Sequence, residues 1–505
     1  MTIELMTILA IVGGGSALMR TSGVRGWMLP AVGLVAGTSL LISIATLQAV
    51  MALPTAPVLT LTLTLAAPTG WWYWQRRQGH DVAVRPASAA IVVATIAVVV
   101  WALRAGNFAN FHYDSYRYLQ GAGLLAGNDL GFQPLQQFET RLLSTAAVHA
   151  PAYLGGEFYM RSITPLLGVA TVALFVWLCS AGLSATLART DVVAITIAST
   201  ALLVTNNRFV FHSFYINGHL VVALLLLVIA GCSWLRVRGA AIPAHTLLVL
   251  QALAIPALIV TRPEGSLLAG LAVIPLVVSD TVPWRQRAML VAVTGGAIFV
   301  WHGFLVLEYA QRGSDAPGSI VIMTALGAVT VAAIPVLGQP RIHVRLGHAP
   351  WLVEVGLWLA LAVLAAHNPR VLYDSGVAAA RNAALGATSW GASLVVLGLL
   401  TAGALVLTNA PHRVHLRFPL TTFIPLSAIL AYLRGGAYRV HEADSLNRML
   451  LHVVPLAVLF VASAATSHEW GFHHAKTPIF GKHLPDPSRK NADRLGISRA
   501  DYDAL

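Results

Sequence analysis

The residues best suited to chemistry stand in short polar segments between long apolar stretches, and Asp114 is the first of them. Asp114 follows an apolar stretch and is flanked by His112, Tyr113, Tyr116 and Arg117. A carboxylate held beside apolar walls accepts a proton more readily than one in water, which suits a general base. An acid in the first turn of a helix, where it stabilises the backbone amides by ~1 kcal/mol, explains the same position.

A second segment, Thr261-Arg262-Pro263-Glu264-Gly265, predicts a tight turn at the end of an apolar helix. Arg262 carries the planar fork of donors that binds phosphate through paired hydrogen bonds, and Glu264 is placed to orient it. An ordinary helix-ending turn with a local ion pair is the alternative interpretation of these residues.

A third segment gathers positive charge near the end of the apolar part of the chain. Its charged residues and histidine are Arg434, Arg439, His441, Glu442, Asp444 and Arg448. Such a cluster can form an anion pocket at a membrane surface, and it can also attract bulk anionic lipid. From the residues alone, Arg262 can hold a phosphate and the three arginines of this segment can hold an anion.

Other polar residues carry weaker signals. Glu139 and Arg141 can supply a second acid and an anchor, while His212 and His219 fit a structural role beside a short turn. The histidines lack a metal-ligand spacing with nearby acids, and the long polar segment holds no Asp-x-Asp pair. A metal is therefore not indicated. The sequence also shows no phosphate-binding loop, dinucleotide fingerprint or nucleophile elbow.

Lipid must cover most of the elements that position these residues. Of the 505 residues, 57% are hydrophobic and 10% are charged, whereas a soluble globular chain carries about 25% charged residues. The apolar blocks of roughly 17 to 25 residues match helices that cross a ~30 Å hydrocarbon core. They are apolar all round, unlike the alternating strands of a membrane barrel. We therefore predict an all-α polytopic bundle of about fifteen helices.

The predicted helices centre near residues 11, 40, 63, 96, 173, 197, 226, 253, 271, 298, 328, 358, 398, 426 and 457. The net charge of +12 is spread over loops that alternate between arginine-rich and arginine-poor. The positive-inside rule then places the N-terminus outside and the C-terminal tail inside. It predicts a multi-pass protein of the inner (plasma) membrane whose polar segments face outward.

Three parts follow from this pattern. We expect an N-terminal three-helix segment at 1–86, a membrane module at 87–467 and a polar cytoplasmic tail at 468–505. The module includes a long extracytoplasmic loop at 105–160. Tyr113, Tyr116, Leu119, Leu124 and Leu125 predict an amphipathic helix in this loop, lying along the membrane interface.

Four segments occur in an order that points to a known family. They are the stretches Asp114–Asn128, Arg161–Gly168, Thr261–Gly265 and Ser445–Pro455. In this order, across roughly residues 88 to 465, the chain resembles the GT-C superfamily, polytopic glycosyltransferases that use polyprenyl-phosphate sugars on the outer membrane face.

The resemblance implies that Asp114 is the catalytic base, which takes the proton of an acceptor hydroxyl while that oxygen attacks the anomeric carbon. The lipid phosphate leaves towards the arginines and the anomeric configuration inverts. The donor would be a polyprenyl-phosphate pentose or mannose, and the acceptor an envelope glycan, lipid or protein. No nucleotide cofactor is needed because the donor arrives activated. The expected pocket residues are His112, Tyr113, Tyr116, Arg117, Glu139, Arg141, Glu264, His441 and Glu442.

Two other functions stay open. A transporter or flippase of lipid-linked sugars would use the arginine cluster but would not need Asp114. A scaffold protein of an envelope complex would need none of these polar residues. Transfer activity that depends on Asp114 separates the enzyme from both.

Overall fold

The computed structural model describes residues 2–78, 88–111, 113–127, 143–339, 346–384, 392–407, 413–433 and 448–464. Within these ranges the chain is all-α, and the single β contact is an isolated parallel bridge between Asn110 and Tyr215. Residues 1–467 belong to one compact unit, so the first three helices pack together with later ones. The predicted tail at 468–505 lies outside the described residues.

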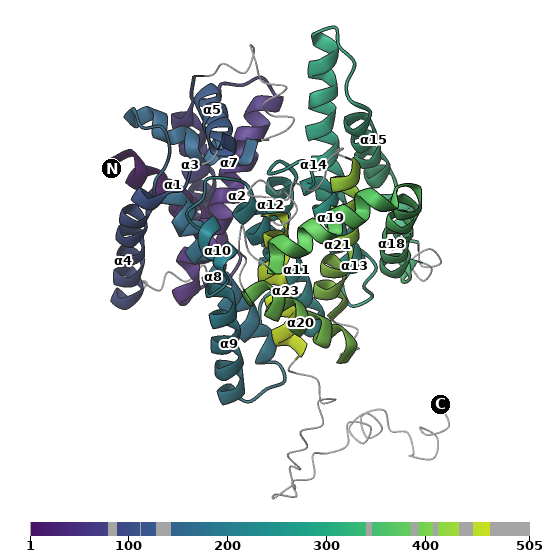
Figure 1. Ribbon diagram of the computed structural model, residues 1–505. Helices are drawn as coiled ribbons and strands as arrows, with labels where there is room; N and C mark the ends of the chain where they lie inside the picture. The colour runs from purple at the N-terminus through teal and green to yellow at the C-terminus, as the bar shows by residue number, and fades with distance from the viewer. Residues whose placement is uncertain are drawn as a thin grey trace, which may run out of the picture. The chain divides into compact units, whose positions relative to one another are not determined.

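Figure 1 shows the helices in chain order. They are α1 (Thr2–Thr21), α2 (Leu29–Val50), α3 (Pro57–Arg77), α4 (Ala89–Ala105), α5 (Tyr113–Gly127), α7 (Leu143–His149), α8 (Ile163–Leu183), α9 (Arg189–Val204), α10 (Asn207–His212), α11 (His219–Arg238), α12 (Ala244–Ile259), α13 (Gly265–Val277), α14 (Trp284–Gln311), α15 (Gly318–Ala332), α16 (Ile334–Leu337), α18 (Ala349–His367), α19 (Pro369–Ala384), α20 (Ala392–Leu407), α21 (Val414–Leu433) and α23 (Val454–Ala464). Short 3₁₀ turns are η1 (Gly26–Met28), η2 (Gly106–Phe108), η3 (Ala150–Gly155) and η5 (Leu450–Val453).

The apolar helices have the length and composition of membrane-spanning segments. Seven of them are long and apolar enough to cross a bilayer: α1, α2 with η1, α4 with η2, α8, α11, α14 and α18. Each of the fifteen predicted centres lies inside a helix. Several of these helices are shorter than a full crossing, α12, α13, α15 and α20 among them. The structure thus supports a helical membrane protein and gives seven candidate spans among its described residues.

Helix α11 forms the centre of the core. Every residue from His219 to Leu235 is buried, because α8, α12, α13, α21 and α23 all pack against it. A helix that is apolar all round can only be this buried when protein surrounds it.

Glycines bring α1 and α2 into close contact. A Cβ added at Gly15 would overlap the carbonyl oxygen of Gly33, and one added at Gly37 would overlap that of Ile11. Small residues at such a crossing let two backbones approach, which is the usual way that membrane helices associate.

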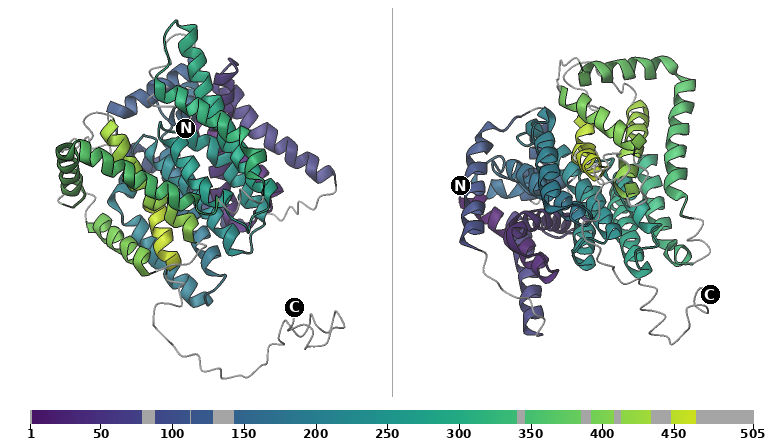
Figure 2. Two further views of the ribbon diagram at one scale, coloured as in Figure 1. Left: turned by 90° about the vertical axis from the view of Figure 1, so that its right-hand side faces the viewer. Right: turned by 90° about the horizontal axis from the view of Figure 1, so that it is seen from below.

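Other apolar helices stand at the periphery. In α18 only Pro350 is buried, and in α4 only Ala102 and Ala105 are. Figure 2 shows α18 and α19 as an outer frame beside the main bundle. Their apolar side chains are exposed on the protein surface, as expected for residues that face lipid.

The described parts of the long loop after α4 are largely helical. The predicted amphipathic helix is α5, which buries Leu119 and Leu125 and packs against α7 and η3. Tyr116 does not share this face, since it is 56% exposed. The positions of the predicted pocket residues Glu139 and Arg141 lie outside the described residues.

Candidate active site

Asp114 and Arg448, 334 residues apart in sequence, form an ion pair. Nη1 of Arg448 lies 3.1 Å from Oδ2 of Asp114, and both side chains are mostly buried, with 13% and 21% of their surface exposed. Asp114 stands in the first turn of α5, and Arg448 stands just before η5 and α23. The pair therefore joins the start of the long loop to the last apolar helix.

The start of α5 is fixed by the segment between α10 and α11. The backbone amide of Asn110 donates to the Phe214 carbonyl at 2.7 Å, and the buried Ser115 hydroxyl donates to the Ile216 carbonyl at 2.9 Å. These two bonds flank Asp114 in sequence. They hold the carboxylate beside Tyr215, whose pKa is raised, mainly by burial, while Arg448 opposes that shift.

Arg262 brings a second guanidinium to the same place from the turn between α12 and α13. Its Nε donates to Oε1 of Glu264 at 2.6 Å, and only 11% and 1% of the two side chains are exposed. Its Nη1 reaches the hydroxyl of Tyr118, one turn after Asp114 on α5, at 3.4 Å. Burial alone lowers the pKa of Arg262, but Glu264, Tyr118 and Asp114 together raise it above the ordinary value. Arg262 is a permanent positive charge.

Two buried histidines extend this network. Nη1 of Arg262 lies 3.5 Å from Nε2 of His219, and Nδ1 of His219 lies 2.8 Å from Nε2 of His452. Arginine only donates, so His219 accepts at Nε2 and donates from Nδ1 to His452. The chain of bonds fixes the neutral tautomers of both rings.

His212 lies against this pair, with its ring centroid 5.5 Å from that of His219. Its Nδ1 donates to the Arg208 carbonyl at 2.8 Å. Burial, with Arg448 and Arg262 nearby, lowers the pKa of His212 to about 3. His212 is thus neutral, and its Nε2 is an acceptor. Among the described residues, neither this atom nor Nε of Arg448 has a hydrogen-bond partner, and both atoms are buried.

The predicted site residues divide into three groups. Asp114, Arg262, Arg448 and Glu264 belong to the network. Tyr116 lies in an aromatic cluster with Phe111 and Phe158 instead, and Arg117 is exposed on α5. The remainder lie outside the described residues, or their side chains do: His112, Tyr113, Glu139, Arg141, Arg434, Arg439, His441 and Glu442.

Sequence reasoning missed three members of the site. Tyr118 and Tyr215 carried no signal that separates them from other aromatic residues of a membrane protein. His452 lies in the Ser445–Pro455 segment, whose arginine alone was singled out. His212 and His219 were assigned a structural role, which their hydrogen bonds support, and they also contact the network through Arg262 and each other.

The network offers two guanidinium groups, two carboxylates, two phenols and neutral histidines. Over the part of the chain that the structure describes, no group of three or more His, Cys, Asp or Glu side chains could hold a metal ion. Comparison with protein families, with curated proteins and with solved structures finds no match for this chain.

Proposed function

We propose that the protein is a multi-pass membrane glycosyltransferase that transfers a sugar from a polyprenyl-phosphate donor, with inversion and with Asp114 as general base. One observation carries the proposal: Asp114, Arg448 and Arg262 come from three distant segments and converge in one network. A base and fixed cations at one place are what displacement of a phosphate by a hydroxyl requires.

Arg448 is the better placed phosphate ligand of the two arginines. Its Nε has no partner among the described residues, whereas Arg262 already binds Glu264, Tyr118 and His219. Arg262 then contributes mainly through its charge, which is strong in a site that excludes water. The leaving phosphate gains negative charge as the glycosidic bond breaks, and both arginines stabilise it.

Donor binding also prepares the base. Arg448 pairs with Asp114, and a phosphate competes with the carboxylate for the same guanidinium. When the phosphate takes Arg448, Asp114 is released towards the acceptor hydroxyl. Its oxygen accepts the proton while the hydroxyl oxygen attacks the anomeric carbon from the face opposite the phosphate.

A cavity beside this site supports the proposal of a lipid-linked donor. A cavity of about 530 Å³ is lined by Trp101, Arg104, Ala105, Phe108, Asn110 and Phe214. It adjoins the Asn110–Phe214 contact that fixes the start of α5. Its aromatic walls suit an isoprenoid chain whose phosphate reaches towards Arg448.

The helix ends around the site support its place at one membrane surface. The C-terminal ends of α4 and α12 and the N-terminal ends of α11 and α13 adjoin the residues of the network. Consecutive spans that alternate in direction bring these ends to the same face. With the positive-inside pattern, we assign that face to the extracytoplasmic side of the inner membrane.

The test is transfer by the Asp114→Asn variant in membranes that supply acceptors, with labelled polyprenyl-phosphate mannose or pentose as donor. Loss of a general base slows the reaction about 10²- to 10⁴-fold. The matched control is Asp191→Asn, which removes an exposed first-turn acid from α9. The control should transfer at the parent rate, because a helix-start acid alone has no role in the reaction.

Two outcomes contradict the proposal. Asp114→Asn protein that transfers as fast as the parent would show that Asp114 is not the base. Parent protein that binds the donor and moves it between leaflets without transferring sugar would instead be a flippase.

A further inference from the structure

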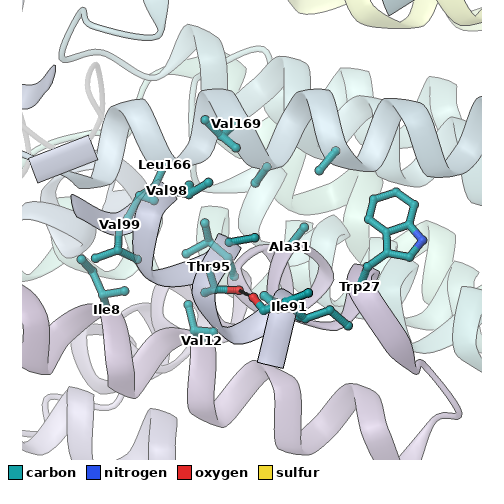
Figure 3. A pocket seen from close by; sticks show the side chains of 16 residues that line it. Ile8, Val12, Trp27, Ala31, Ile91, Thr95, Val98, Val99, Leu166 and Val169 are labelled. Atoms are coloured by element: carbon teal, nitrogen blue, oxygen red, sulfur yellow. Dashed lines mark hydrogen bonds between the residues drawn. The ribbon is translucent and has the colours of Figure 1, made fainter. Parts of the chain in front are cut away.

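A further cavity, almost wholly apolar, also lies beside α4. Helices α1, α2, α4 and α8 enclose an apolar groove of about 350 Å³. Figure 3 shows Ile8 and Val99 at one end of it and Trp27 at the other. Thr95 turns its hydroxyl to the Ile91 carbonyl at 2.7 Å, so the groove presents almost only hydrocarbon.

The groove has the depth of one lipid leaflet. On α4 its lining residues run from Ala90 to Val99, which is about 14 Å at 1.5 Å per residue. The hydrocarbon core of a bilayer is ~30 Å thick, so the groove is as deep as one of its two leaflets.

A charged pocket lies about one helical turn beyond the Ile8 end of the groove. It has a volume of about 230 Å³ and is lined by Glu4, Leu103, Arg104, Asn107, Glu157 and Arg161. Glu4 precedes Ile8 by one turn of α1, and Leu103 follows Val99 by one turn of α4. The charged pocket therefore continues the line of the apolar groove.

The charges of this pocket balance. Nη2 of Arg161 binds Glu157 at 2.8 Å, and the buried Glu4 carboxylate accepts the backbone amide of Arg161. Arg104 is exposed and forms no ion pair among the described residues. An anionic group alone would meet the two carboxylates as well as the two arginines. A zwitterion satisfies both signs.

We propose that this is a binding site for one phospholipid with an ammonium–phosphate headgroup, such as phosphatidylethanolamine. The phosphate binds Arg104, the ammonium group binds Glu157 and one acyl chain fills the groove down to Trp27. Arg104 also lines the cavity proposed for the donor's lipid chain, so the two sites adjoin at this residue. It gives α4, which buries only Ala102 and Ala105 against protein, a lipid as its packing partner.

The experiment measures quenching of tryptophan fluorescence in the full chain, reconstituted in bilayers that contain phosphatidylethanolamine brominated near the chain end. The chain has 13 tryptophans, so the signal of Trp27 is the difference between the parent and Trp27→Phe. We expect this signal to saturate at a low fraction of brominated lipid. Ala94→Phe, which fills the groove, should abolish the saturable part, and Arg104→Gln should raise the half-saturating fraction at least threefold.

The controls introduce the same residue types, phenylalanine and glutamine, at exposed positions elsewhere. Ile197→Phe alters an exposed apolar residue of α9, and Arg189→Gln removes an exposed arginine at the start of that helix. Both should quench like the parent. The site is absent if quenching rises without saturation, or if Ala94→Phe, shown to be folded by its thermal unfolding, quenches like the parent. Stronger saturation by brominated phosphatidylglycerol would overturn the zwitterionic headgroup.

Discussion

The two polar sites of this protein use the same residue types in opposite ways. In the Asp114 network, Arg262 and Glu264 pair with 11% and 1% of their side chains exposed. In the charged pocket beside α4, Arg161 and Glu157 pair with 41% and 47% exposed. The first pair cannot exchange its partner for water, while the second can. Burial, rather than the arginine–carboxylate pairing itself, decides which pair holds its charges in a fixed position.

The largest expected effect is on the buried pair. Glu264→Ala leaves Arg262 as an unpaired buried charge, which lowers the free energy of unfolding by about 3–5 kcal/mol. Chemical unfolding in detergent measures it. The double variant Arg262→Leu with Glu264→Leu should recover a large part of this loss, because no lone charge remains. A Glu264→Ala variant as stable as the parent would mean that the site is more hydrated than the structure shows.

The next effect concerns Arg448, the guanidinium with an unused donor. Arg448→Gln should lower kcat/KM for the polyprenyl-phosphate donor roughly 10- to 150-fold. This corresponds to a loss of about 1.5–3 kcal/mol of transition-state stabilisation, as expected for a charge-assisted hydrogen bond. Arg417→Gln is the control, since Arg417 pairs with Glu354 away from the network. Equal donor use by parent and Arg448→Gln would leave Arg448 with only a structural role.

An acid-dependent loss of stability is expected where the charged pocket joins the core. His149 accepts a hydrogen bond from the Met160 amide at 3.1 Å, and burial lowers its pKa to about 3. Its unfolded value is 6.5, so the unfolded chain binds a proton first as the pH falls. The contribution of the neutral ring to the free energy of unfolding is fully present above pH 6.5 and is lost as the pH falls towards 3.

Between pH 7 and pH 5 this group should cost about 2 kcal/mol of unfolding free energy, at 1.36 kcal/mol for each pKa unit. His149→Asn keeps an acceptor for the Met160 amide but does not titrate. Its unfolding free energy should fall less between the two pH values than that of the parent, by that amount. Identical pH dependence in both proteins would show that His149 can be hydrated in the folded state.

The smallest effect is expected at the exposed Arg161–Glu157 pair. Glu157→Gln should change the unfolding free energy by only ~0–1 kcal/mol, because exposed ion pairs are screened by water. The measurement is the one used for Glu264→Ala. A loss of 3 kcal/mol or more would make the two pairs equivalent and remove the distinction between the sites.

Four residues of the network could be singled out from the sequence because their signals are local. Arg262 and Glu264 are two residues apart in a turn, and Asp114 begins a helix after an apolar stretch. The partners of these residues could not be predicted. Ser115 forms a hydrogen bond with Ile216, 101 residues away in sequence, and His219 forms one with His452, 233 residues away. No local pattern encodes such contacts.

The sequence by itself determined the helices and their membrane character, because hydropathy over about 20 residues is a property of each segment alone. It could not determine what each helix faces. α11 and α18 are both apolar, yet α11 is buried from His219 to Leu235, while α18 buries only Pro350. A helix that is apolar all round can pack against lipid tails or against apolar side chains, because both are equally hydrophobic. Only the tertiary structure decides which helices enclose the site and which face the bilayer.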